Sequence, residues 1–192
     1  MSKEIIGITG TNGSGKDTLA NYLVEEKGFK FMSARDFLLE EINKKKIKYS
    51  NENVREMLIE VANDLRDEHG PSYITEQLFK KANEESKDEK IAFGSLRTPG
   101  EIIYLREKGN CLIVGVGAFW FIRYLRIIKR KGITDRIGPI KFLRQELKER
   151  KNDDPNKQNL RKCEEMSDYV IKNNWSLKRF NKKIDKTLEK AF

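Results

Sequence analysis

Runs of apolar residues alternate with stretches of helical periodicity from one end of the chain to the other. Short apolar or β-branched runs predict strands over residues 4–9, 29–32, 91–95, 111–116 and 169–172. Apolar residues that recur at helical spacing predict helices over residues 17–26, 34–45, 52–67, 73–82, 99–108, 119–131, 140–150 and 156–166, and from about 176 onward. When strands alternate with helices, each helix usually connects two parallel strands through a right-handed crossover. We therefore expect an α/β fold with helices on both faces of a parallel sheet.

One helix start is predicted by its capping residues. In the segment TPGE, Thr98 can cap a helix, Pro99 fits the first helical position, and Glu101 can complete a capping box. The helix over residues 99–108 should therefore begin at Pro99.

Composition narrows the class of protein. The chain of 192 residues carries a formal net charge of +9, but its lysines are scattered among acids on helix faces, so we expect no nucleic-acid partner. The longest apolar run, residues 111–122, is shorter than the about 20 residues that span a bilayer, so no membrane role is expected. Two cysteines are too few for a disulfide framework and fit a reducing cytoplasm. We expect one cytoplasmic domain over residues 1–192.

A glycine-rich segment follows the first predicted strand and enters the first predicted helix. Gly10, Gly15 and Lys16 satisfy the pattern G-x-x-x-x-G-K. Glycines let backbone N–H groups turn toward phosphates, the helix N-terminus adds a favourable dipole, and the lysine neutralises charge. The segment predicts a loop that binds ATP through Thr11, Asn12, Gly13, Ser14, Gly15, Lys16, Asp17 and Thr18.

Asp17 stands where such a loop normally has Ser or Thr. Thr18, one place later, still offers a hydroxyl group. The loop resembles those of nucleoside monophosphate kinases, several of which lack Ser or Thr directly after the lysine. We expect Mg²⁺ near Asp17 and Thr18, held largely through water and phosphate oxygens.

The resemblance extends over nearly the whole chain. The stretches SARDFLLEEI, LRTPGEIIYLR, DDPNKQNL and MSDYVIKNN resemble a P-loop kinase-like group related to dephospho-coenzyme A kinase and the nucleoside monophosphate kinases, found alone or joined to a cytidylate deaminase-like domain. This resemblance implies a three-layer P-loop fold with a five-stranded parallel sheet. It also implies an acceptor-binding insertion at about residues 33–86, a lid at about 123–166, and phosphoryl transfer from ATP to a small nucleotide-like acceptor.

The resemblance also places acceptor contacts after two strands. Ser33, Arg35 and Asp36 follow the second strand, where they bind the acceptor or form a helix cap with a surface ion pair. Arg97 follows the third strand and faces the ligand side of the sheet. It either contacts an anion or forms a structural ion pair.

Further candidates lie in the implied lid and after the last strand. Arg123, Arg126 and Arg130 lie in the lid arm, and Arg136 is a weaker candidate. Arginine suits the spread charge of a phosphoryl group, so Lys16, Arg97, Arg126 and Arg130 form the predicted catalytic set. The resemblance places Asn173, with the residues up to Ser176, at the adenine pocket; the alternative is that they form a turn and helix cap.

Two features depart from the resemblance. Gly94 stands where the relatives commonly carry a carboxylate, so Asp17 or Asp36 would have to replace it. The stretch from Phe119 to Ile128 is apolar nearly all round. One face should pack on the sheet, and the rest is either buried beneath lid helices or forms a partner surface such as a homodimer seam.

Three functions therefore stay open. The chain is a kinase of a (deoxy)nucleoside monophosphate, a dephospho-coenzyme A kinase, or an ATP-binding protein that has lost efficient turnover and acts by association through the Phe119–Ile128 helix.

Overall fold

The protein is a three-layer α/β structure built on one parallel sheet. The computed structural model describes residues 4–50, 54–85, 90–130 and 138–191. Within these residues the sheet has five strands in the order β2-β3-β1-β4-β5, and every neighbouring pair is parallel. This confirms the predicted fold class. The strands are β1 (Glu4–Thr9), β2 (Lys30–Ser33), β3 (Lys90–Leu96), β4 (Asn110–Gly117) and β5 (Tyr169–Lys172).

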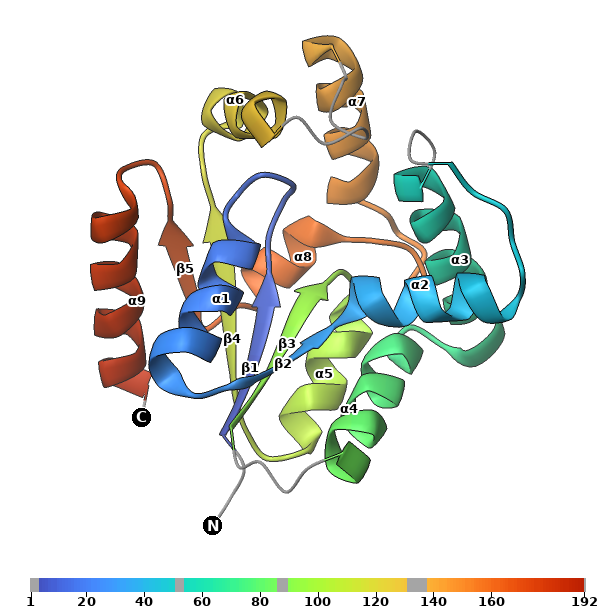
Figure 1. Cartoon of the computed structure of the whole chain (residues 1–192), viewed down its shortest axis with the longest axis horizontal. Coiled ribbons are helices and arrows are strands. Elements are labelled where there is room, and N and C mark those ends of the chain that lie inside the picture. Colours follow the sequence, from blue (N-terminus) through green and yellow to red (C-terminus); the bar gives the residue numbers. More distant parts are fainter. Residues whose placement is uncertain (1–3, 51–53, 86–89, 131–137, 192) are drawn as a thin grey trace.

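Helices cover both faces of the sheet and its carboxyl edge (Figure 1). Helices α1 and α9 pack on one face, α4, α5 and α8 cover the other with α2 and α3 beside them, and α6 and α7 lie beyond the carboxyl ends of the strands. The helices are α1 (Lys16–Lys27), α2 (Ala34–Lys44), α3 (Val54–His69), α4 (Tyr73–Glu85), α5 (Pro99–Glu107), α6 (Trp120–Arg130), α7 (Pro139–Arg150), α8 (Leu160–Glu165) and α9 (Leu177–Ala191).

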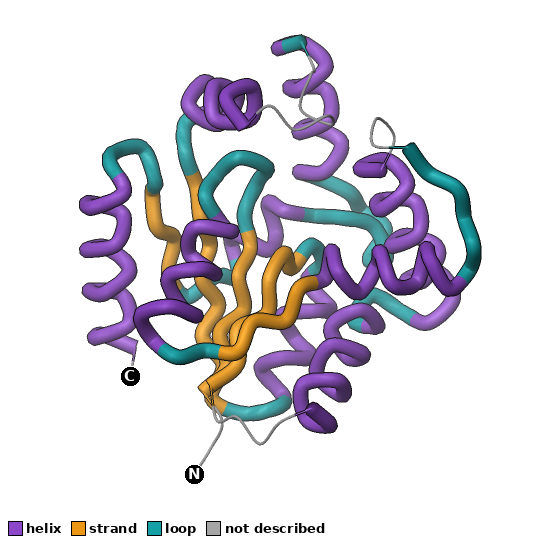
Figure 2. Tube along the Cα trace, viewed as in Figure 1, coloured by secondary structure: helices purple, strands orange, loops and turns teal. Residues whose placement is uncertain are grey.

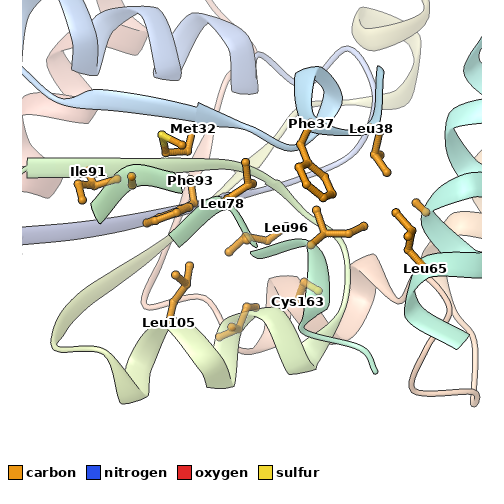
Figure 3. Close-up of a cluster of buried hydrophobic side chains, with 14 of the residues drawn as sticks. Met32, Phe37, Leu38, Leu65, Leu78, Ile91, Phe93, Leu96, Leu105 and Cys163 are labelled. Carbon is orange, nitrogen blue, oxygen red and sulfur yellow. The ribbon is translucent and has the colours of Figure 1, made fainter. Parts of the chain in front are cut away.

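The alternation of side chains along β1 supplies both hydrophobic cores. Ile6 and Ile8 point into the core beneath α1 and α9, whereas Ile5 points into the core on the opposite face. Figure 3 shows the second core, where Phe93 and Leu96 of β3 meet Leu105 of α5. A central strand buried on both sides fixes the register of the sheet and with it the edge where ligands bind.

The capping prediction at Thr98 is confirmed, and one helix prediction is wrong. The Thr98 hydroxyl accepts a hydrogen bond from the backbone N–H of Glu101, whose carboxylate accepts one from the backbone N–H of Thr98. The helix expected over residues 156–166 is limited to α8, because Asn159 caps it by accepting from the backbone N–H of Lys162. Before that cap, the side chain of Asp154 accepts from the backbone of Asn156 in a tight turn.

Loops that carry candidate residues gather at one edge of the sheet (Figure 2). The loop after β1 and the segments that follow β3, β4 and β5 all leave the carboxyl ends of parallel strands, the usual ligand side of such a sheet. Within the part of the chain that the structure describes, every helix is too short or too polar to cross a bilayer.

Candidate functional site

The glycine-rich loop between β1 and α1 needs glycine for both conformation and space. Gly10, Gly13 and Gly15 have φ angles of 141°, 74° and 106°, which other residues rarely adopt. A methyl group at Gly10 would lie 2.2 Å from the carbonyl oxygen of Val116, and one at Gly15 would lie 2.2 Å from Nδ2 of Asn173. The backbone is therefore wound tightly against its neighbours at the N-terminus of α1.

Two polar side chains of this segment, Lys16 and Ser14, are buried instead of facing water. Lys16 is buried and its Nζ donates to the carbonyl oxygen of Thr11 at 2.9 Å. Burial, and next the positive charge of Arg97, lower the pKa of Lys16 to about 7. Ser14 is fully buried, and none of the described residues pairs with its hydroxyl. A buried ammonium, an orphaned hydroxyl and a tightly wound backbone together fit an anionic chain such as the phosphates of ATP.

Arg126 and Asn173 donate hydrogen bonds to backbone carbonyl groups of this loop. Asn173 Nδ2 donates to the carbonyl oxygen of Ser14 at 2.9 Å. Arg126 Nη2 donates to the carbonyl oxygen of Asn173 at 2.9 Å, and its Nη1 lies 3.4 Å from the carbonyl oxygens of Gly13 and Ser14. The two side chains engage loop carbonyls.

A cavity of about 270 Å³ opens beside the loop. It is bounded by the start of α1, by α2 and α3, by the end of β3 and by the end of α7. Of the candidates that the sequence singles out, the structure brings together along its lining Asn12, Lys16, Asp17, Ser33, Arg35, Arg97 and Arg130. Thr18, Asp36, Arg126 and Asn173 are outside this lining, and Arg136 lies outside the described residues.

The acceptor candidates after β2 show one of the expected local structures. The Ser33 hydroxyl accepts from the backbone N–H of Asp36 at 3.2 Å and so caps α2. Ser33 and Arg35 still line the cavity, whereas Asp36 turns toward solvent. The cap is thus present, and the acceptor role of these residues stays a prediction.

Arg97 lies in a partly buried ion cluster that joins the segment after β3 to α3 and α7. Its Nη1 is 3.0 Å from Oε2 of Glu149 on α7, and the other carboxylate oxygen of Glu149 pairs with Arg55 on α3. Burial raises the pKa of Glu149, but the charges of Arg97 and Arg55 outweigh burial, so the pKa lies below its ordinary value. The cluster places two guanidinium groups and one ionised carboxylate at the cavity wall.

The missing carboxylate at Gly94 has a steric reason. A methyl group at Gly94 would lie 2.3 Å from Cζ of Phe31, whose ring lines the cavity. The neighbouring Ser95 has a φ angle of 66°, a conformation that costs a non-glycine residue about 1 kcal/mol. At this point the pairing of β1 with β3 shifts register. The end of β3 is thus shaped to seat an aromatic ring and to direct the chain toward Arg97.

The side chains around Asp17 do not form a recognisable magnesium site. The Asp17 side chain is 84% exposed, with one carboxylate oxygen 4.0 Å from Nη1 of Arg130. Among the described residues, no three His, Cys, Asp or Glu side chains converge to hold a metal ion.

Sequence reasoning missed three charged residues of the cavity wall, namely Arg55, Arg66 and Glu149. Arg66 lies four residues after Ala62, on the buried stripe of α3, and Glu149 lies seven residues after the buried Phe142 of α7. A charged residue in line with buried apolar ones is a signal that could have identified both. No comparable signal marks Arg55.

Helix α6 does not pack on the sheet as expected, and of the two alternatives for its remaining surface, exposure dominates, although Tyr124 and Arg123 lie against Phe142 of α7. Its buried residues Arg123 and Ile127 face the glycine-rich loop, and Ile127 belongs to neither core. Four large apolar side chains of α6, and Phe119 just before it, are more than two-fifths exposed: Trp120, Phe121, Leu125 and Ile128. The exposed surface is present, and its partner stays a prediction.

The sheet order, the wound glycine loop and the buried lysine define a P-loop protein with a kinase-like fold. A family model described as an AAA domain, AAA_18, matches residues 6–167. The chain belongs to this family.

Similar proteins were found in sequence and in structure. The chain is 27% identical over 187 residues to a UPF0200 protein of Sulfurisphaera tokodaii, with 97% of each chain covered. Shikimate kinase from Acinetobacter baumannii, solved in complex with shikimate, has a TM-score of 0.59 at 18% identity and covers 97% of this chain and 92% of its own. Dephospho-CoA kinase from Campylobacter jejuni has a TM-score of 0.56 at 12% identity and covers 97% and 96%. At these identities the two solved structures establish a shared fold.

Proposed function

We propose that this protein is an ATP-dependent phosphotransferase whose acceptor is a small nucleotide-like molecule. One observation carries the proposal: a glycine-rich loop with a buried, depressed-pKa lysine opens onto a cavity whose wall is rich in arginine. The solved kinases with this fold, which act on shikimate or dephospho-coenzyme A by their names, support a kinase over other P-loop functions.

The nucleotide is held by the loop from Thr11 to Thr18. Bound ATP supplies the phosphoryl group. The loop backbone and the Ser14 hydroxyl bind its phosphate oxygens, and Lys16, recharged by the bound anion, neutralises the developing charge. Thr18 and Asp17 are the residues that would lie beside Mg²⁺, with most magnesium ligands coming from water and phosphate. Asn173 completes the site by holding the loop.

The acceptor occupies the cavity between the implied insertion, residues 33–86, and the implied lid, residues 123–166. Arg97 and Arg55 at its wall suit an anionic group, and Arg35 and Arg130 add positive charge at the rim. Asp17 lines this cavity and Asp36 does not, so Asp17 is the carboxylate that replaces the one missing at Gly94. Of the two acceptors that the sequence suggests, we favour a (deoxy)nucleoside monophosphate over dephospho-coenzyme A.

The test is phosphoryl transfer from Mg-ATP to a panel of ribo- and deoxynucleoside monophosphates, nucleosides and dephospho-coenzyme A. Lys16→Ala serves as the blank. Product from one acceptor, absent with the variant, establishes the kinase and its substrate. No product from any acceptor, while the protein still binds ADP, overturns the kinase.

A second candidate function is favoured by the exposed apolar face of α6. An ATP-binding protein with little turnover that acts by association would use this face, which carries Trp120, Phe121 and Leu125 in solvent. The mass of the protein in solution tests whether copies associate through this face.

A further inference from the structure

Arg66 is a buried arginine with hydrogen-bonding capacity left over. It is 2% exposed and lies on α3 in the wall of the 270 Å³ cavity. Its Nη2 is 3.5 Å from Oε1 of Glu101, and none of the described residues accepts a hydrogen bond from its Nε or Nη1. A buried donor without an acceptor costs about 1 to 3 kcal/mol. A group that fills the cavity and brings an acceptor to Arg66 would remove this cost.

The charge of Arg66 is already countered. Glu101 is 1% exposed, and its other oxygen accepts from the backbone N–H groups of Arg97 and Thr98, so the carboxylate is fixed in place. A second buried anion beside Glu101 would have to overcome its repulsion. The unpaired donors of Arg66 therefore suit a neutral acceptor, such as a carbonyl oxygen, better than a carboxylate or phosphate.

Apart from Glu101, apolar side chains lie on the face of α3 that carries Arg66. Leu58 and Ala62 line the cavity from the same face of α3, and Ile74 of α4 joins them. The cavity lining thus combines the cations Lys16, Arg97 and Arg55 with the apolar Leu58, Ala62 and Ile74, and Arg66, one helical turn after Ala62, adds unpaired hydrogen-bond donors.

We infer that Arg66 reads the base of the acceptor nucleotide and selects a base with an oxo group at the edge remote from its sugar. The inference rests on the proposed function and narrows it. The acceptor phosphate lies at Arg97 and Arg55, the base lies among Leu58, Ala62 and Ile74, and Arg66 donates to the oxo oxygen. Because arginine has donors only, it favours guanine, uracil and thymine, which present an oxygen there, over adenine and cytosine, which present an amino group.

The experiment measures binding of GMP, UMP, dTMP, AMP and CMP to the full-length protein by calorimetry. Wild-type protein should bind one or more oxo-base monophosphates at least about tenfold tighter than AMP and CMP. Arg66→Lys keeps a positive charge for Glu101 but loses the spread donors, so the ratio should fall to within about threefold. Arg144→Lys, on the exposed face of α7, is the matched control and should keep the wild-type ratio.

A double variant protects the test against misfolding. If Arg66→Lys unfolds, the double variant Arg66→Met with Glu101→Gln removes both charges and should lose the same discrimination. Preference for AMP or CMP, or a ratio that is unchanged in the Arg66 variants, overturns the inference.

Titration with ADP separates this inference from the proposed function. ADP binding without binding of any nucleoside monophosphate overturns the inference and leaves the nucleotide loop standing. Arg66-dependent base selection without ADP binding supports the inference and overturns the kinase.

Discussion

Helices α9 and α6 are both strongly amphipathic, yet they turn opposite faces toward the protein. Helix α9 buries Phe180 and Ile184 in the core between the sheet and helices α1 and α9. It leaves Lys178, Lys182 and Lys186 in solvent. Helix α6 buries Arg123 and Ile127, and its apolar side chains Phe121, Leu125 and Ile128 face solvent. Apolar burial positions α9, whereas α6 is positioned by its guanidinium groups, which donate to backbone carbonyls and, from Arg123, to the carboxylate of Glu146.

This difference indicates different roles for the two helices. Hydrophobic burial is nondirectional and holds α9 as part of the scaffold. Charge-assisted hydrogen bonds are directional, and those of Arg123 and Arg126 reach the carbonyl oxygens of Asn12, Gly13 and Ser14 in the glycine-rich loop. Arg123 also pairs with Glu146 of α7 at 2.7 Å. The position of α6 is therefore coupled to the shape of the loop, and stability and nucleotide affinity should separate when each helix is altered.

The largest expected effect is on stability, from Phe180→Ala in α9. Phe180 is fully buried in the core with Leu19 and Val116, so its truncation should lower the free energy of unfolding by about 3 to 5 kcal/mol. Chemical denaturation followed by circular dichroism measures it. Lys182→Ala, on the exposed face of the same helix, is the control and should change stability by less than about 0.5 kcal/mol. A loss below about 1 kcal/mol for Phe180→Ala would contradict the role assigned to α9.

The next effect is on nucleotide affinity, from Arg126→Met in α6. The variant removes the donors to Gly13, Ser14 and Asn173, so the loop carbonyls lose their partner and ADP should bind about tenfold to a hundredfold more weakly, at about 1.5 to 3 kcal/mol for hydrogen bonds to a charged group. Calorimetric titration with ADP measures it. Lys129→Met, exposed on the same helix, should bind ADP as wild type does. Equal ADP affinity in the two variants would break the proposed coupling between α6 and the loop.

The sequence predicts what local signals determine, and it fails where distant elements decide. The glycine loop and the Thr98 cap depend on residues within about seven positions of one another, and both were placed correctly. Periodicity also identified α6 and α9, but a period does not say which face is buried. The arginines of α6 face inward because they donate hydrogen bonds to carbonyl groups of the glycine-rich loop. These carbonyl groups lie more than 100 residues away in the sequence.

The same limit applies to the cavity wall. Arg66 and Glu149 meet other elements only after folding, so their partners cannot be found from neighbours in the sequence. Gly94 shows the converse, because its missing side chain is explained by the ring of Phe31 from the adjacent strand. In each case the decisive contact spans two strands or helices.

A moderate effect on stability is expected from pH, because Lys16 lies in the segment that α6 contacts. The pKa of Lys16 lies at about 7, below its ordinary value of 10.5, so between these values the unfolded chain binds more protons than the folded one. The contribution of this residue to stability therefore rises with pH across that window, by at most about 1.4 kcal/mol per pH unit.

Phosphate binding requires the charged form of Lys16, so ADP affinity should change in the opposite sense. Above pH 7 it should fall, by up to about tenfold per pH unit. Calorimetry in two buffers of different ionisation enthalpy should detect proton uptake on ADP binding at pH 8. Lys16→Met should abolish this uptake, and proton release by the wild type would contradict the depressed pKa.

The smallest effect on stability, and the sharpest test of the α6 face, comes from Trp120→Lys combined with Leu125→Lys. Both side chains are about half exposed or more, so a monomer should lose less than about 0.5 kcal/mol of stability. If the face is a homodimer seam, two new charges on each copy should convert a dimer to a monomer, which light scattering after size exclusion measures. Val24→Lys on the exposed face of α1 is the control. An unchanged mass rules out the seam, and the exposed side chains of α6 are then the consequence of an inward-facing arginine pair that the loop requires.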